Sequence, residues 1–109
     1  MQNWQQRALE FAQKHNYSRP PSVYALDLMS ELGEAAKAVL VGTNYGERPF
    51  HTTPDFTSEL GDVLYSLCLL AASANIDLET AFTASLDKYE QRWQTTGQIG
   101  SSADNQVSI

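Results

Sequence analysis

The sequence predicts an all-α protein, built as a small bundle of four main helices. Apolar residues recur at helical spacing in four segments, and prolines or capping side chains stand where the later segments begin. The chain has 109 residues, of which 42% are hydrophobic, an ordinary share for a globular protein. That length suffices for one hydrophobic core and is too short for two.

The first two helices are predicted over residues 2–14 and 22–41. Pro20 and Pro21 separate them, because tandem prolines cannot continue a helix interior but fit the first turn of the next helix. Gly42 follows the second helix and is expected to cap its C-terminus. A loop over residues 42–53 then leads to the third helix.

The third helix is predicted over residues 54–74 and is the most apolar, which favours a central position. Its start, Thr53–Asp55, combines a hydroxyl cap, a proline and an acid near the positive end of the helix dipole. Asp77 is predicted to cap the fourth helix, with Thr80 in the capping-box position and the helix running to about Trp93. The fourth helix is expected to bury four apolar side chains, Leu78, Ala81, Phe82 and Leu86.

Domain organisation follows from these segments. We expect residues 1–94 to form one helical domain and residues 95–109, which are polar and small, to be a flexible C-terminal tail. Cys68 lies in an apolar run and is interpreted as a small buried hydrophobe, since one cysteine cannot form a disulfide within the chain.

The net charge of −6 and the pI near 4.6 argue against nonspecific binding to nucleic acid or to an anionic membrane. The N-terminus has no basic segment followed by an apolar one, so a cytoplasmic location is expected. An acidic protein that handles phosphates needs cations to bridge the like charges. This requirement directs attention to the carboxylates.

Two acidic pentads, Ser30–Glu34 and Ser58–Asp62, share the pattern Ser-Glu-Leu-Gly-acid. Acids three residues apart lie about 60° apart on a helix, so each pair presents its carboxylates on one face. Two such pairs facing each other across a helix contact would offer four oxygen ligands to a divalent cation such as Mg²⁺. The alternative is an ordinary solvated acidic face, but apolar neighbours and the repetition of the pentad favour a metal site.

Lys88 and Arg92 lie four residues apart on the fourth helix and therefore share a face. A basic pair beside an acidic metal cluster suits a triphosphate, because the cations hold the phosphate oxygens that the metal leaves free. Taken alone, the pair is better explained by cations that complement the C-terminal end of the helix dipole.

These motifs together resemble the MazG-like family of all-α nucleoside triphosphate pyrophosphohydrolases, including its dCTP-pyrophosphatase type. The resemblance covers about residues 4–93. Two positions depart from the family pattern: Ser30 stands where many relatives carry a glutamate, and Tyr89 where an asparagine is often found. The matching segments are Glu31-Leu-Gly-Glu34-Ala-Ala-Lys-Ala, Glu59-Leu-Gly-Asp62-Val-Leu-Tyr-Ser-Leu, Asn75-Ile-Asp-Leu-Glu-Thr-Ala-Phe and Lys88-Tyr-Glu-Gln-Arg92-Trp93.

The resemblance implies hydrolysis of an NTP or dNTP to the monophosphate and pyrophosphate. It also implies a homodimer or a tetramer made of dimers, and a Mg²⁺ cofactor for which Mn²⁺ can substitute. Lys88 and Arg92 would hold phosphate oxygens. The metal-binding and catalytic residues would be Glu31, Glu34, Glu59 and Asp62. The base would stack on aromatic side chains, with Tyr17, Tyr24 and Tyr65 as candidates beside Trp4 and Phe11.

Two readings from other classes remain open at this point. A ferritin-like di-metal carboxylate bundle also uses paired acids on helices, but it needs a Glu-x-x-His pattern. Neither His15 nor His51 follows a glutamate at that spacing. The other reading is a non-catalytic helical interaction module whose acids are only solvated.

Overall fold

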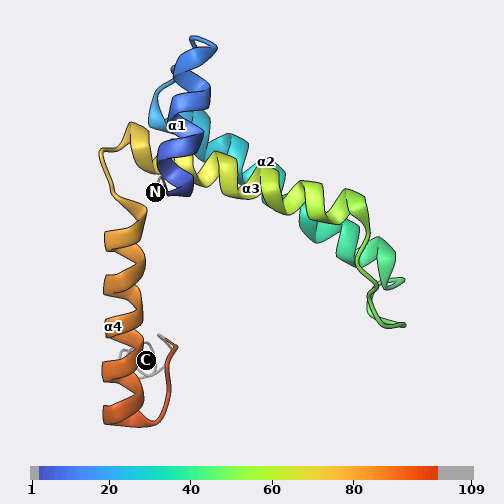
Figure 1. Cartoon of the computed structure of the whole chain (residues 1–109). Coiled ribbons are helices and arrows are strands. Elements are labelled where there is room, and N and C mark those ends of the chain that lie inside the picture. The colour runs from blue at the N-terminus through green and yellow to red at the C-terminus, as the bar shows by residue number, and fades with distance from the viewer. Residues whose placement is uncertain (1–2, 101–109) are drawn as a thin grey trace. The chain divides into compact units, whose positions relative to one another are not determined.

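The computed structural model describes residues 3–100, and every regular element in that range is an α-helix (Figure 1). The all-α prediction is confirmed. The helices are α1 (Trp4–Lys14), α2 (Pro21–Gly42), α3 (Pro54–Ser73) and α4 (Leu78–Thr96). In the described range, each helix begins and ends within three residues of the predicted position.

The chain divides into two compact units, one ending at Ile76 and the other beginning at Asp77. The first unit contains α1, α2 and α3, and the second contains α4. Because the boundary between the units falls inside residues 1–94, a single domain over that range stays a prediction. Of the predicted tail, residues 101–109 lie outside the described range.

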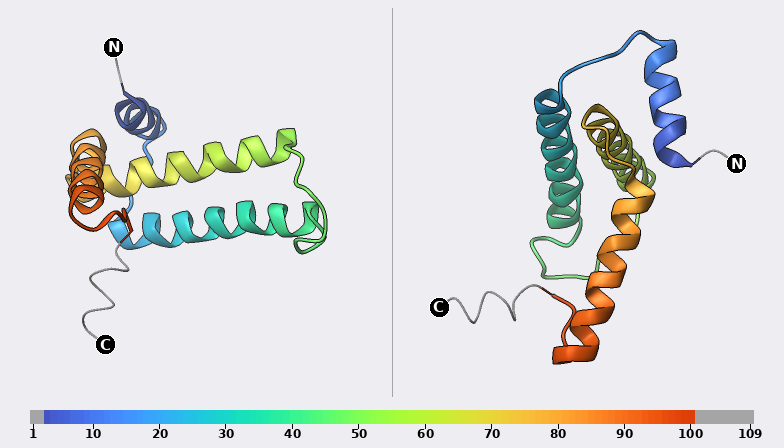
Figure 2. Two further views of the ribbon diagram at one scale, coloured as in Figure 1. Left: turned by 90° about the horizontal axis from the view of Figure 1, so that it is seen from below. Right: turned by 90° about the vertical axis from the view of Figure 1, so that its left-hand side faces the viewer.

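In the first unit, α3 packs against both α1 and α2, which confirms its central position (Figure 2). α2 and α3 run side by side along most of their length. Small side chains allow these close approaches. The buried residues of this unit are Ala8 and Ala12 on α1, Tyr24 and Ala35 on α2, and Ser66, Cys68, Leu69 and Ala71 on α3. Burial raises the pKa of the Cys68 thiol, as expected for a cysteine that acts as a core hydrophobe.

The predicted helix starts are confirmed by their hydrogen bonds. The Thr53 hydroxyl oxygen accepts from the backbone N–H of Phe56 at 3.1 Å. The Asp77 carboxylate accepts from the Thr80 backbone N–H at 3.0 Å and from the Thr80 hydroxyl at 2.7 Å. These caps satisfy donors that have no partner within their own helix.

The predicted C-cap at Gly42 is wrong. Gly42 is the last residue of α2, and the cap is Thr43, whose hydroxyl donates to the carbonyl of Val39 at 2.9 Å. Gly42 is needed for a different reason, because a Cβ at this position would lie 3.1 Å from the Phe50 ring. The glycine therefore makes room for the loop that returns the chain from α2 to α3.

The second unit, taken by itself, does not bury the apolar side chains of α4: Ala81, Phe82 and Leu86 are exposed in it, and Leu78 is half-buried. The pattern of apolar residues is helical as predicted, and the burial of this face stays a prediction. Within residues 3–100 no single helix is long and apolar enough to cross a membrane, and α3 and α4 meet that criterion only when taken as a pair.

The Asp77 cap leads to a first prediction. Hydrogen bonds from the Thr80 hydroxyl and backbone N–H lower the pKa of Asp77 below its ordinary value of 3.8. The stabilisation is therefore present above that pH and is lost as the pH falls through the pKa of the folded state. At neutral pH, Asp77→Ala is expected to lower the free energy of unfolding, because both hydrogen bonds to Thr80 are lost.

Urea denaturation followed by circular dichroism measures this loss, and the difference from wild type should shrink below pH 3.8. Asp77→Asn is the matched control, because asparagine caps helices about as well as aspartate. Equal stability of wild type and Asp77→Ala at neutral pH would contradict the role assigned to this cap.

Candidate functional site

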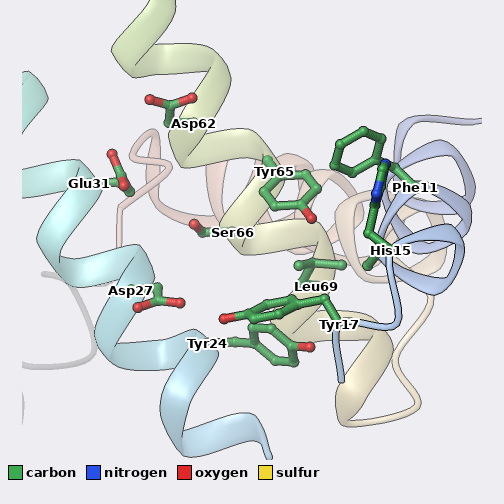
Figure 3. A pocket seen from close by; sticks show the side chains of 11 residues that line it. Phe11, His15, Tyr17, Tyr24, Asp27, Glu31, Asp62, Tyr65, Ser66 and Leu69 are labelled. Carbon is green, nitrogen blue, oxygen red and sulfur yellow. The ribbon is translucent and has the colours of Figure 1, made fainter. Parts of the chain in front are cut away.

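A hollow of about 630 Å³ opens in the first unit where α1, α2 and α3 meet (Figure 3). Three carboxylates line it: Asp27 and Glu31 come from α2, and Asp62 comes from α3. Packing of α2 on α3 brings Glu31 and Asp62, one acid from each predicted pair, to the same cavity. The proposed convergence of the two pairs across a helix contact thus holds for these two residues.

Aromatic side chains form the rest of the wall. Tyr17 and Tyr24 pack edge to face with ring centroids 5.9 Å apart, and Phe11 and Tyr65 do so at 6.0 Å. The Tyr24 hydroxyl accepts a hydrogen bond from the backbone N–H of Arg19 at 3.0 Å, which ties the segment after α1 to α2. All three tyrosines predicted for the base, Tyr17, Tyr24 and Tyr65, therefore line the same hollow as Glu31 and Asp62.

The pKa of Glu31 reports on the electrostatics of the carboxylate end of the hollow. Its pKa is raised, first by desolvation, then by the negative charges of Glu34 and Asp62, and also by a side-chain hydrogen bond with Glu34. The charge of Asp27 adds the smallest contribution. The charges of Glu34 and Asp62 thus repel that of Glu31, and a bound cation would relieve this repulsion.

Glu59, the remaining acid of the two pairs, is half-buried on α3. Its Oε2 is buried and makes no hydrogen bond. A buried carboxylate oxygen without a partner is costly, since such groups are normally paired or coordinate a metal. Within the described residues, therefore, no protein group pairs with this oxygen of Glu59.

We tested whether this donor set fits a divalent metal. Within residues 3–100, no three His, Cys, Asp or Glu side chains converge closely enough to form a ready metal site. The chemistry of the set nevertheless fits, because carboxylate oxygens are the ligands of Mg²⁺, and Glu59 contributes an oxygen without a partner.

Lys88 and Arg92 lie on α4, in the second unit, and are described only against that unit. They line a hollow of about 430 Å³ together with Tyr89, Ile99 and Gly100. The Lys88 Nζ lies 5.3 Å from the centre of the Tyr89 ring, and an Arg92 guanidinium nitrogen donates to the Ile99 carbonyl at 3.5 Å. Gly97, with a φ of 73°, turns the chain after α4 so that residues 98–100 reach this basic pair.

Sequence reasoning missed three residues that line the larger hollow as candidates for the site. Asp27 was visible as an acid one turn before Glu31 on the same helix face. Ser66 follows Tyr65 on α3 and is buried. His15 follows Phe11 by four residues, so helical spacing could have placed it beside that ring, whose centroid lies 4.6 Å away.

The sequence is similar to those of known proteins. The family described as the MazG nucleotide pyrophosphohydrolase domain matches residues 19–96. The uncharacterized protein YpjD of Bacillus subtilis (strain 168) is 40% identical over 82 residues, which cover 72% of this chain and 71% of YpjD. No solved structure matches significantly. The chain therefore belongs to the MazG nucleotide pyrophosphohydrolase domain family and is a hydrolase that acts on phosphoric anhydrides.

Proposed function

We propose that the protein hydrolyses a nucleoside or deoxynucleoside triphosphate to the monophosphate and pyrophosphate, with Mg²⁺ as cofactor. The observation that carries the proposal is the hollow in the first unit, where Glu31 and Asp62 stand beside three tyrosine rings. A nucleotide has an aromatic base at one end and a polyanion at the other. A cavity with aromatic walls and a carboxylate end that needs a cation is complementary to both.

In this proposal Glu31, Glu34, Glu59 and Asp62 hold the metal. When bound, Mg²⁺ neutralises charge on the phosphate oxygens and lowers the pKa of a bound water. Tyr17, Tyr24 and Tyr65 hold the base, because all three line the hollow and a planar base stacks favourably on aromatic rings.

The chain's own part in the chemistry is positioning and proton transfer. One carboxylate of the set orients the attacking water and accepts its proton. The water oxygen forms a bond to phosphorus as the bond to the pyrophosphate oxygen breaks, and the leaving group departs with the electron pair. Lys88 and Arg92 hold phosphate oxygens of the substrate or of the leaving pyrophosphate.

A panel of NTPs and dNTPs tests this proposal. Hydrolysis is measured with Mg²⁺, with Mn²⁺ and with a chelator. We expect turnover with either metal, none with the chelator, and no absorption bands from a redox-active metal. The di-metal carboxylate alternative requires such bands, and an interaction module would show no metal-dependent turnover at all.

Lys88→Ala and Arg92→Ala are expected to raise the KM for the triphosphate or lower kcat by about tenfold or more. A hydrogen bond to a charged group contributes about 1.5–3 kcal/mol, and each 1.4 kcal/mol is a factor of ten. The melting temperature should change little, because Lys88 is exposed and Arg92 only half-buried. Steady-state kinetics and thermal melts measure both effects.

Lys14→Ala is the control for loss of one positive charge, because Lys14 is an exposed residue in the last turn of α1. If Lys88→Ala and Arg92→Ala both show wild-type kinetics, the basic pair does not hold the phosphates of the substrate.

We further propose that the chain assembles as a homodimer or a tetramer. α2 carries a second apolar stripe, whose positions on a helical projection lie roughly opposite the face that buries Tyr24 and Ala35. Leu26 and Met29 on this stripe are 68% and 72% exposed. Exposed apolar stripes of this kind mark protein contacts, and symmetric dimers are the commonest way to cover them.

A further inference from the structure

Asp27 lies at the junction between the aromatic and acidic parts of the large hollow. On α2 it stands three residues after Tyr24 and four before Glu31, so all three share one face of the helix within about two turns. Its side chain lines the hollow. In Figure 3 the Tyr17 hydroxyl and the Asp27 carboxylate point toward one another, with Glu31 and Asp62 farther along the cavity.

Among the three carboxylates that line the hollow, Asp27 lies next to the rings of Tyr17 and Tyr24 (Figure 3). Asp27 also belongs to neither acidic pair. It is therefore a negative charge next to the aromatic walls rather than among the proposed metal ligands.

A carboxylate beside the aromatic rings favours a base that can donate a hydrogen bond to it. An ionised aspartate only accepts hydrogen bonds. The exocyclic amino group of cytosine donates to such an acceptor, and so does that of adenine. Uracil and hypoxanthine carry a carbonyl oxygen at the same ring position, and that oxygen would face the carboxylate as a second acceptor.

We propose that Asp27 is a specificity-determining residue, which selects nucleotides whose base carries an exocyclic amino group over those with a carbonyl at that position. The inference rests on the proposed function, because it assumes that the base occupies the aromatic part of this hollow. It does not depend on which residues bind the metal, provided that Asp27 is not one of them.

The test compares two pairs of nucleotides that differ at this one group, CTP with UTP and ATP with ITP, in whichever sugar series the enzyme accepts. Wild type is expected to favour the amino-bearing member in kcat/KM by about ten- to a hundredfold, the range for a hydrogen bond to a charged group. Asp27→Asn should reduce both ratios to within about threefold, because an amide both donates and accepts.

Asp27 is exposed, so the substitution is expected to leave the fold intact, which circular dichroism checks. Glu79→Gln removes one charge from an exposed acid in the first turn of α4 and is the matched control. Its nucleotide ratios should equal those of wild type.

Calorimetric titration of CMP and UMP in the absence of metal gives a second measurement that does not depend on turnover. Wild type should bind CMP more tightly, and Asp27→Asn should bind both alike. Equal binding of CMP and UMP to wild type, or binding of neither, overturns the inference.

The kinetic outcomes separate this inference from the proposed function. If Asp27→Asn slows the hydrolysis of all four nucleotides equally and leaves the kcat/KM ratios unchanged, Asp27 belongs among the metal ligands. That result would overturn the inference and leave the proposed function standing. A wild type that hydrolyses none of the nucleotides yet binds CMP over UMP would contradict the proposed function and support the inference.

Discussion

Asp62→Asn or Glu34→Gln is expected to lower kcat by at least about a hundredfold at saturating Mg²⁺. A metal that stabilises charge in the transition state contributes several kcal/mol, and two powers of ten correspond to about 2.7 kcal/mol. Both side chains are exposed, so the substitutions should not disturb packing. Helix content by circular dichroism is expected to match wild type while steady-state turnover is lost.

The same variants should be no less stable than wild type when metal is absent. Each removes a negative charge that acts on Glu31, and thus relieves repulsion within the cluster. Glu59→Gln is expected to raise the melting temperature of the metal-free protein, because it neutralises a carboxylate with a buried oxygen that has no partner. Glu79→Gln serves as the control, and retention of more than a few per cent of activity by Asp62→Asn would count against these ligand assignments.

The second large effect concerns assembly. Light scattering at low micromolar concentration is expected to give at least twice the chain mass of 12.1 kDa. Met29→Glu should lower that mass or unfold the protein, because it places a charge within the apolar stripe of α2, where Met29 is 72% exposed in the single chain.

Gln13→Glu is the control for this substitution, since Gln13 is exposed on α1, away from the stripe. Its mass and stability should equal those of wild type. A folded and active wild-type species of about 12 kDa would show that the chain functions without a second copy.

The helices could be predicted from the sequence because their signals are local. Thr53 and Asp77 cap the helices that follow them, through hydrogen bonds to residues only three positions away. Gly42 was misassigned because its role is a contact with Phe50, which lies across the loop and leaves no local mark. The exposure of Phe82 likewise depends on what covers α4, which helical spacing does not encode.

The acidic part of the site was predictable for the same local reason, since helical spacing puts the paired acids on one face. Packing of α2 on α3 then brings Glu31 and Asp62 to one hollow. The aromatic part was predicted only as a set of candidates, because Tyr17 reaches the hollow through its ring contact with Tyr24. The contact of His15 with Phe11, four residues earlier, was within reach of helical spacing, but only the packing of α1 on α3 brings both rings to the cavity wall.

Phosphorus NMR of the products tests the central claim most directly. A nucleoside triphosphate is incubated with the wild-type protein and Mg²⁺, with Asp62→Asn as the inactive control. We predict equal amounts of nucleoside monophosphate and pyrophosphate, and neither product from the variant. Formation of orthophosphate and nucleoside diphosphate, or equal turnover by wild type and Asp62→Asn, would contradict the account.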